Sequence, residues 1–576
     1  MSLKSIVLLL PVVLVFLSTG ILLGDTGEST AESRYASADR EGRGYILGVE
    51  TSLVKIRRDK PFEGPIGGSV KISACRNEYE AAQVVIAAYD RMLRNVSVSV
   101  SALKGPHSAK IGAGNITLNR VDYVHTRKPE YAVDYVGWYP DPLMDIKPFD
   151  VYKGDVQPIW ITVYVPENTR PGVYKGHITV KPVNAPETVL PIKVQVWNFA
   201  LPKTPNLITA FSTCEGQLGA WYGGLTPEIR RAYYDFLLKH RINPTNIYST
   251  VIMPTKDEIE FCIEHGMNAF NLCYINKNYD EKERAELLKQ LKDLESFLKE
   301  KGCWDKAYVY GFDEPQPAKY PEIREMFGWI KKNFPDLPRV CTVYPCEELK
   351  GYVDIWVPLT GGYNPQIAAE YIKNGDKFWW YVACIPHHPY PNWFTDYPAI
   401  DQRILPWMNW KQKIPAILYY AINLWTSNSM VDNLPDWVKP HPSQAAREAI
   451  RAGKRWPEVS WNTFTFSGFN GDGDLVYPGP DGKPISSIRL ECLRDGIEDY
   501  DYFCILNDLY EQAGKSSQAI DPALMKKAGR LLLINDNVVA NVITYTHDPA
   551  VLLDARLNMA DTIEKLTAAL TTGEKE

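Results

Sequence analysis

Residues 45–203 alternate between hydrophobic and polar side chains with the period of a half-buried β-strand. Residues 96–101 alternate valine with serine, and residues 192–196 alternate aliphatic residues with lysine and glutamine. Segments rich in proline, glycine and asparagine, such as residues 167–172, separate these runs. Alternation interrupted by regular turn signals is typical of antiparallel sheets that bury one face. The sequence therefore predicts a β-sandwich domain over residues 45–203.

From residue 204 the pattern changes to short apolar runs that alternate with amphipathic helical segments. Eight of these runs are expected to be strands: residues 207–211, 246–248, 269–274, 307–312, 339–344, 355–359, 378–385 and 416–423. Between the third and fourth runs, leucines repeat with helical spacing from Leu287 to Leu298. Parallel strands that are buried on both faces have such continuous apolar sequences. We therefore predict a (β/α)8 barrel over residues 204–456, with a short or missing helix between its fifth and sixth strands.

The barrel has one structural alternative, a doubly wound open sheet. No glycine-rich phosphate loop follows the first apolar run, which disfavours that alternative. Residues 443–456 are rich in alanine and arginine and predict a helix that closes the barrel. Residues 457–576 are predicted to form a C-terminal extension of strands and helices packed on the barrel.

The N-terminus has the organisation of a secretory signal peptide. Lys4 precedes an apolar run, and small residues at 29–31 offer a cleavage site. An uncleaved anchor is the alternative, because a run of about twenty residues could span a bilayer. We therefore expect residues 1–25 to be a signal peptide or anchor and the protein to be exported to the periplasm, cell surface or medium. The polar residues 26–44 are expected to form a flexible linker.

Composition narrows the possible partners. The chain has 63 basic and 69 acidic residues and no basic block, which argues against nucleic-acid binding. Aromatic residues make up 12%, and such flat amphipathic rings suit a surface that stacks on sugars. The ten cysteines are scattered without a CxxC pair, and the nine histidines lack metal-ligand spacing. No metal or cofactor is therefore expected, and buried free thiols are favoured over disulfides.

The motif Phe312-Asp313-Glu314-Pro315 ends the fourth predicted strand, and barrel active sites lie at the carboxyl ends of strands. Two neighbouring carboxylates repel each other, so one is expected to hold a proton at neutral pH, as a general acid for a glycosidic bond requires. Adjacent residues of a strand point in different directions and cannot flank a sugar ring. The pair instead suits substrate-assisted hydrolysis, with Asp313 orienting the sugar's 2-acetamido group and Glu314 as general acid/base. The alternative is a helix cap or an exposed turn.

Aromatic and polar residues near the ends of other predicted strands are candidates for substrate contacts. The predicted substrate-binding residues are Tyr274, Tyr344, Asn392, Trp393, Arg403 and Trp425. Two other functions remain possible at this point. One is a glycosidase for another sugar, with a separate nucleophile such as Asp396 or Glu215. The other is a non-catalytic carbohydrate-binding surface protein.

Taken in order, these motifs resemble glycoside hydrolase family 123, the β-N-acetylgalactosaminidase family. The motifs that carry the resemblance are Asn77-Glu-Tyr-Glu-Ala-Ala-Gln83, Phe312-Asp-Glu-Pro315, Pro391-Asn-Trp-Phe394 and Arg494-Asp-Gly-Ile-Glu-Asp-Tyr500. The resemblance implies a β-sandwich before a barrel and metal-independent, retaining release of terminal β-linked N-acetylgalactosamine from a glycan. It assigns the stabilising carboxylate to Asp313 and the acid/base to Glu314. It also implies a tyrosine that contacts the acetamido group, for which Tyr274 and Tyr344 are candidates.

Overall fold

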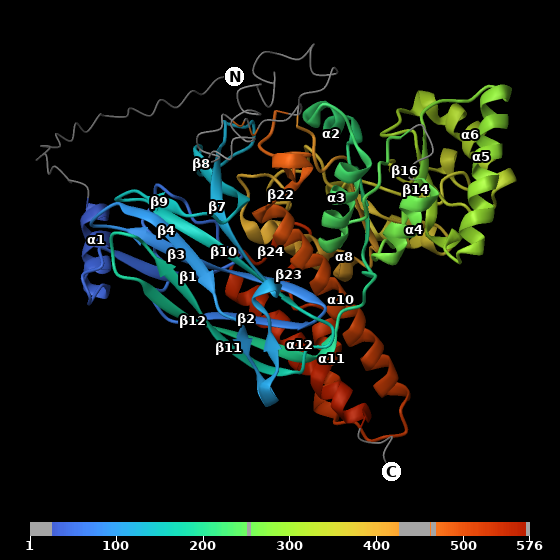
Figure 1. Cartoon of the computed structure of the whole chain (residues 1–576). Coiled ribbons are helices and arrows are strands. Elements are labelled where there is room, and N and C mark those ends of the chain that lie inside the picture. The colour runs from blue at the N-terminus through green and yellow to red at the C-terminus, as the bar shows by residue number, and fades with distance from the viewer. Residues whose placement is uncertain (1–25, 250–254, 426–460, 462, 464–467, 572–576) are drawn as a thin grey trace, which may run out of the picture.

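The computed structural model describes residues 26–249, 255–425, 461, 463 and 468–571. It is a mixed α/β, multidomain arrangement with an all-β N-terminal region and a helical C-terminus (Figure 1). The predicted signal segment and the predicted helix at 443–456 lie outside the described residues. Within the described ranges, no helix has the length and apolarity needed to cross a bilayer.

The N-terminal region consists of two sheets. The first contains, in spatial order, β1 (Tyr45–Thr51), β3 (Glu78–Ala88), β10 (Val156–Val165), β7 (Ile116–His125), β8 (Trp138–Asp145), β22 (Pro484–Ser487) and β21 (Tyr477–Pro478). The second contains β2 (Val70–Arg76), β12 (Thr188–Ala200), β11 (Gly172–Lys181), β4 (Leu93–Val100) and β9 (Phe149–Val151), with the short strands β5 (Leu103–Lys104) and β6 (Lys110–Ile111) beside β11. The predicted all-β region is therefore confirmed.

Alternation along the strands explains how the two sheets share a core. On β10, Ile159, Ile161 and Val163 are buried in one hydrophobic cluster with residues of β2, β11 and β12. The residues between them, including Trp160 and Thr162, point to the opposite face of the first sheet. That outer face is therefore available to helices from other parts of the chain.

The second half of the chain contains parallel strands. These are β13 (Ile208–Phe211), β14 (Phe270–Ile275), β15 (Ala307–Gly311), β16 (Arg339–Cys341), β17 (Ile355–Trp356), β18 (Lys377–Phe378), β19 (Trp380–Tyr381) and β20 (Ala416–Tyr419). Strands β14 to β18 form a five-stranded sheet in sequence order, and β13, β20 and β19 form a three-stranded sheet. The (β/α)8 barrel expected from the sequence thus corresponds to two parallel sheets. Isolated parallel bridges join Ser212 to Thr245 and Leu359 to Tyr381.

Helices follow most of these strands. They are α2 (Glu215–Tyr222), α3 (Pro227–Lys239), α4 (Lys256–Glu264), α5 (Glu281–Glu300), α6 (Tyr320–Asn333), α7 (Pro365–Ile372) and α8 (Ala399–Gln412). The leucine-rich segment predicted as a helix is α5, which begins at a capping box between Asp280 and Glu283. Between β16 and β17 there is only a 3-10 turn (Glu347–Leu349), which agrees with the expected short connection.

Two sequence-based expectations are wrong. Residues 246–248 form no strand, since the only sheet-like contact described there is the single bridge at Thr245.

The segment 26–44, expected to be a flexible linker, contains helix α1 (Thr26–Ala38). The ring of Tyr35 is buried, and its hydroxyl donates a hydrogen bond of 3.0 Å to the Phe62 carbonyl. One aromatic anchor therefore docks a segment whose composition is otherwise that of a tether.

The C-terminal helices connect the two halves. They are α10 (Ile488–Lys515), α11 (Pro522–Leu532) and α12 (Pro549–Thr571), with a small hairpin of β23 (Val539–Asn541) and β24 (Thr544–Tyr545). Helix α10 packs on α8 and α12, and α12 packs on β12. All ten cysteines are free thiols.

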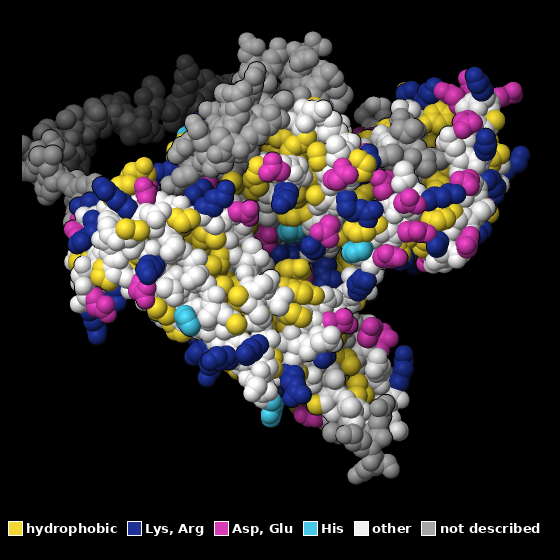
Figure 2. All heavy atoms as spheres, in the orientation of Figure 1, with side chains coloured by type: hydrophobic (Ala, Val, Ile, Leu, Met, Phe, Trp, Pro, Cys, Tyr) yellow, Lys and Arg dark blue, Asp and Glu magenta, His cyan; other side chains and the backbone are white. Residues whose placement is uncertain are grey.

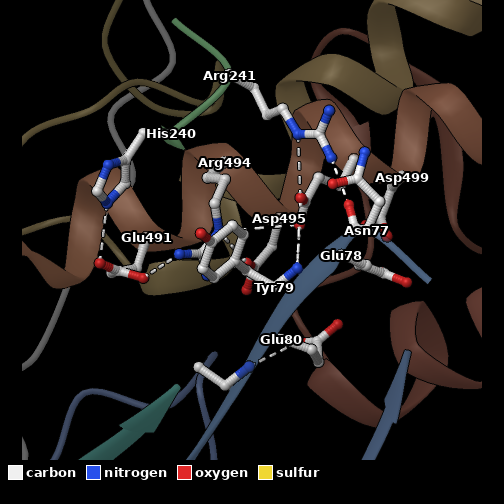
Figure 3. A network of polar contacts seen from close by, with 12 residues as sticks. Asn77, Glu78, Tyr79, Glu80, His240, Arg241, Glu491, Arg494, Asp495 and Asp499 are labelled. Atoms are coloured by element: carbon white, nitrogen blue, oxygen red, sulfur yellow. Dashed lines mark hydrogen bonds and ion pairs between the residues drawn. The ribbon is translucent and has the colours of Figure 1, made fainter. Parts of the chain in front are cut away.

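A buried network of acids and arginines lies where these regions meet, and Figure 3 shows part of it. Arg403 of α8 forms ion pairs with Glu80 of β3 and with Asp499 of α10, at 3.0 and 2.7 Å. Arg556 of α12 pairs with Asp499 at 2.7 Å and with Glu78 of β3. A buried charge is costly unless it is paired, so the three regions must pack together for the network to be satisfied.

Candidate active site

The predicted pair, Asp313 and Glu314, lies in the loop that joins β15 to α6. Strand β15 ends at Gly311, where a Cβ atom would lie 2.7 Å from the Ile275 carbonyl oxygen of β14. Phe312 and Glu314 then adopt positive φ values of 52° and 43°, which non-glycine residues seldom adopt. These conformations turn the chain sharply just after the strand. Both acidic residues are exposed to solvent as a result.

Asp313 is surrounded by hydroxyl groups. Tyr310 donates a hydrogen bond to Oδ1, and Thr342 donates another to the same atom at 3.0 Å. The hydroxyl of Tyr248 lies 3.5 Å from Oδ2, and the backbone N–H of Asp313 donates to the Tyr274 hydroxyl at 3.3 Å. These contacts fix the plane of the carboxylate and leave Oδ2 as its less occupied oxygen.

Glu314 is held at two points. Its backbone N–H donates to the Thr342 hydroxyl at 2.8 Å, so that one threonine positions both acids. The Tyr381 hydroxyl donates to Glu314 Oε1 at 2.5 Å. Neither carboxylate has an arginine or lysine within ion-pair distance among the described residues, and both remain available to an incoming ligand.

The phenols around the pair remain protonated and able to donate. Burial raises the pKa of Tyr310 well above 10, and the neighbouring phenol Tyr248 and carboxylate Asp313 raise it further. Burial also raises the pKa of Tyr381, and its hydrogen bond to Glu314 adds to this effect. The site therefore offers neutral hydroxyl donors beside two solvent-facing carboxylates, an arrangement suited to proton transfer and to hydrogen bonding of a polar substrate.

Two of the predicted substrate-binding residues lie at this site. The Tyr274 ring stacks on that of Tyr310, with centroids 5.5 Å apart. Tyr344 is 51% exposed, and the charge of Glu314 adds to burial in raising its pKa. A Cβ atom on Gly362 would lie 2.2 Å from the Tyr344 ring, so the ring packs directly on this glycine. Both tyrosines can therefore contact a ligand held by the acids.

Three other predicted contacts are wrong, because these side chains are buried. Asn392 is fully buried and donates to the carbonyls of Ala383 and Pro386 at 2.9 and 3.1 Å. Trp393 is fully buried in the hydrophobic core, with Phe211 and Tyr419 beside it. Trp425 is 1% exposed, and its indole N–H donates to the Val476 carbonyl at 2.7 Å.

The prediction for Arg403 is also wrong. Its guanidinium is fully buried in the network described above, at the junction of α8, α10 and β3. Burial lowers its pKa, but the surrounding carboxylates Asp499, Glu80 and Asp495 raise it by more, so its pKa lies well above its usual value. Arg403 is therefore a structural cation that neutralises buried acids and cannot reach a ligand at Asp313.

The alternative nucleophiles considered from the sequence are already engaged. Asp396 is buried and accepts hydrogen bonds from Tyr131 at 2.8 Å and Asn470 at 2.7 Å. Glu215 forms a two-point ion pair with Arg230, at 2.8 and 3.1 Å. In the described part of the chain, no three His, Cys, Asp or Glu side chains are grouped so that they could hold a metal ion.

Sequence reasoning missed four residues of the site: Tyr248, Tyr310, Thr342 and Tyr381. Tyr310 and Thr342 lie near the carboxyl ends of adjacent strands, β15 and β16. Their position could have identified them, because a tyrosine or threonine at the carboxyl end of a predicted parallel strand is a candidate for the site. Tyr248 and Tyr381 carried weaker signals, because their segments form little or no regular strand.

Two family descriptions match the chain. "Glycoside hydrolase 123, catalytic domain" matches residues 229–506, and "Glycoside hydrolase 123 N-terminal domain" matches residues 57–182. No curated protein matches the sequence.

Among solved structures, a family 123 glycoside hydrolase from Clostridium perfringens, described for glycolipid glycan hydrolysis, superposes with a TM-score of 0.65. It is 14% identical, and the alignment covers 92% of this chain and 99% of that one, which establishes a common fold. A Bacteroides ovatus xyloglucanase covers 78% of this chain and 99% of its own at 10% identity, but its TM-score of 0.21 carries no argument. Both parts of the family pattern are present in order, and the fold agrees with a member of that family. The chain belongs to glycoside hydrolase family 123.

Proposed function

We propose that this glycoside hydrolase removes a terminal β-linked N-acetylgalactosamine from glycans by retaining, substrate-assisted catalysis. The observation that carries the proposal is the adjacency of Asp313 and Glu314 on one loop, both exposed and neither ion-paired among the described residues. Two carboxylates so placed cannot lie on opposite faces of one sugar ring, as an enzyme nucleophile and its acid must. A nucleophile supplied by the substrate removes that geometric conflict.

In the first step, Glu314 gives its proton to the glycosidic oxygen while the bond from that oxygen to C1 breaks. The carbonyl oxygen of the 2-acetamido group forms a new bond to C1, which gives an oxazolinium ring. Asp313 accepts a hydrogen bond from the acetamido N–H through its less occupied Oδ2 and balances the charge that develops there. Tyr310 and Thr342 hold the other carboxylate oxygen in place.

In the second step, Glu314 takes a proton from water, and the water oxygen bonds to C1 from the face that the leaving group has vacated. The C1 bond to the acetamido oxygen breaks, so the acetamido group is restored and the sugar leaves with its original anomeric configuration. Tyr381 donates to Glu314 in both steps and steadies its direction of approach.

We propose that the two parallel sheets form one (β/α)8 barrel with this site at its carboxyl end. One buried cluster supports this, because it takes side chains from all eight predicted strand segments: Ala210, Ile247, Ala269, Tyr308, Val340, Ile355, Trp379 and Ala416. Tyr308 and Tyr310 belong to this cluster, whereas Val309 between them belongs to the outer core. An experimental structure with eight strands in a closed hydrogen-bonded ring is the check.

We also propose glycolipid glycans as substrates and export as the route to them. The neighbouring C. perfringens enzyme supports the first point, and the signal-like residues 1–25 support the second. Release of N-acetylgalactosamine from a purified glycolipid, followed by mass detection, tests the substrate. Cell fractionation followed by N-terminal sequencing of the purified protein tests export and cleavage.

The reaction itself is tested with a pair of aryl glycosides that differ only at C2. We expect turnover of aryl N-acetyl-β-galactosaminide, no turnover of aryl β-galactoside, and a β-configured first product by NMR. Thiazoline analogues of the oxazolinium ring should inhibit competitively. Equal turnover of both glycosides, together with indifference to thiazolines, would show that a separate enzyme nucleophile is used.

A further inference from the structure

A hollow lies between the first N-terminal sheet and the helices, on the face drawn in Figure 2. It has a volume of about 630 Å³, within the ~300–1,000 Å³ range of small-molecule sites. Its lining comes from β3, β7, β8 and β10 on one side and from α3, β22 and α10 on the other. None of its lining residues belongs to β13–β20 or to the loops that follow those strands. The hollow is therefore a site distinct from Asp313 and Glu314.

Strand register explains the chemistry of its floor. Thr117 of β7 lies opposite Thr162 of β10, and Tyr164 of β10 lies opposite Tyr79 of β3. Cross-strand partners project to the same face, so these four side chains form one surface on the outer face of the first sheet. The next positions along this face are buried against the rest of the molecule, as the full burial of Trp160 shows. The floor is thus the part of the sheet face that α10 leaves uncovered.

The buried charged groups that line the hollow are already paired. Arg494 donates to Glu491 and, at 2.7 Å, to Asp495, and Figure 3 shows it between the two. His240 and Ser486 also hydrogen-bond Glu491, at 3.0 and 2.7 Å. Arg120 forms a two-point contact with Asp122, at 2.7 and 2.8 Å. The buried wall therefore has no unpaired guanidinium or carboxylate among the described residues, whereas Asp145, Lys147 and Lys483, which also line the hollow, are exposed and have no ion pair there.

The floor instead offers neutral hydroxyls and aromatic rings. Among the described residues, the hydroxyls of Thr117, Thr162 and Tyr79, which line the hollow, have no hydrogen-bond partner. Burial raises the pKa of Tyr79 to about 12, so its hydroxyl is a neutral donor. The Tyr79 and Tyr164 rings stack with centroids 4.5 Å apart, and the Phe236 ring lies on the opposite wall. Hydroxyls that both donate and accept, beside apolar ring surface, match the two faces of a sugar.

We propose that this hollow is a second, non-catalytic carbohydrate site that binds a neutral oligosaccharide segment. The choice of a carbohydrate rests on the proposed function, since a glycan-cleaving enzyme meets several glycan branches on one surface. Binding one branch in the hollow raises the local concentration of other branches at the catalytic acids. The site would then increase action on multivalent glycans and leave small aryl glycosides unaffected.

The test uses Thr117→Trp, which fills the floor with a ring that strands accept readily. The probe is an array of defined oligosaccharides of two to six sugars, neutral and sialylated, with binding constants from calorimetry. In a Glu314→Gln background, which prevents hydrolysis, we expect Thr117→Trp to weaken binding of at least one neutral oligosaccharide more than tenfold. The double substitution Thr117→Val/Thr162→Val keeps the volume but removes both hydroxyls, and should weaken the same binding by about three- to tenfold.

Val189→Trp on the exposed face of β12 is the matched control. It should bind the oligosaccharides as strongly as the Glu314→Gln protein does. Thr117→Trp with Glu314 intact should hydrolyse the aryl glycoside at the parental rate, which shows that it folds. Unchanged array binding by both floor variants, or binding of sialylated chains alone, overturns the inference. The two proposals can also fail separately. If the protein hydrolyses no glycoside, but Thr117→Trp still weakens its binding of a neutral oligosaccharide, the proposed function is refuted and the proposed binding site is supported.

Discussion

Two regions of this molecule are rich in acidic side chains but have opposite surroundings. Asp313 and Glu314 are exposed at the end of β15, and hydroxyl groups hold them. Glu78, Glu80 and four acids of α10 are buried, and guanidinium groups hold them; the four are Glu491, Asp495, Glu498 and Asp499. A hydroxyl fixes a carboxylate without neutralising it, whereas an arginine fixes it and cancels its charge. The partner's charge therefore separates an acid that can react from an acid that joins parts of the fold.

The buried region also shows how pairing and burial compete. Burial alone raises the pKa of Glu80, but Arg403 and Arg556 lower it more, to about 2. For Asp495, burial outweighs its arginine neighbours and raises the pKa to about 7. Within one network, the arginines thus offset the effect of burial on the pKa for some acids and not for others.

The largest expected effect is on catalysis. Glu314→Gln should lower kcat on the aryl N-acetyl-β-galactosaminide by roughly 10²–10⁴-fold, because the proton donor is lost. The free energy of unfolding should change by less than about 0.5 kcal/mol, since the residue is exposed. Stopped assays and chemical denaturation measure the two quantities. Glu322→Gln on α6 is the control, and equal loss in both variants would contradict the assignment.

Arg403→Met should have the opposite effect to Glu314→Gln: a large loss of stability with little change in kcat. Removing the cation leaves Glu80, Asp495 and Asp499 without their shared partner, so we expect a loss of about 3–5 kcal/mol in the free energy of unfolding. The fraction that remains folded should keep its kcat. Urea titration combined with assays below the transition measures both.

A surface ion pair gives the comparison for Arg403. Arg58 and Asp155 are 3.2 Å apart, and both side chains are partly exposed. Arg58→Met should therefore lower the free energy of unfolding by at most about 1 kcal/mol. A similar loss from both arginine substitutions would mean that the buried network is no more important to stability than a surface contact.

Tyr381→Phe should have an intermediate effect on catalysis. It removes the hydroxyl that donates to Glu314, a bond to an ionisable partner worth about 1.5–3 kcal/mol, so kcat/KM should fall by roughly 10- to 100-fold. Tyr363→Phe is the control, because that ring packs edge-on against Phe378 and Trp380 and no hydrogen bond from its hydroxyl is described. Equal activity of the two variants would remove Tyr381 from the site.

The smallest expected effect is a change in how the free energy of unfolding depends on pH. Burial raises the pKa of Asp501 to about 6, so between pH 4 and pH 6 the native state holds a proton that the unfolded chain has lost. The free energy of unfolding therefore falls as pH rises through this window, by up to about 1.4 kcal/mol per pH unit from this group. Asp501→Asn should flatten that slope, measured by denaturation at pH 4.5, 5.5 and 6.5. Asp508→Asn, exposed on the same helix, should leave the slope unchanged.

Much of the fold could be predicted from local patterns in the sequence. Alternation predicted the all-β region, and apolar runs predicted strands close to β13–β20, because burial on one face or both imposes these periods directly. The strand-end rule also located Asp313 and Glu314, since their neighbours in sequence define the end of β15.

The substrate-contact residues were less predictable. Trp393, Trp425 and Arg403 have residue types that suit sugar binding, but the same types fill cores and neutralise buried acids. Which role a side chain takes depends on partners far away in sequence, such as Glu80 for Arg403. Tyr35 shows the same dependence, because its docking partner Phe62 lies 27 residues further on. A single sequence contains no record of such distant contacts.

Strand β22 has a consequence for how the protein is made. It pairs with β8 and completes the first N-terminal sheet with residues from beyond position 480. At ~5–20 residues per second, the ribosome needs roughly 15–60 s to reach β22 after finishing residue 203. Throughout that interval the edge of β8 has no neighbour and could pair with another nascent chain. Until β22 has been made, this edge of β8 is therefore open to pairing with the wrong strand.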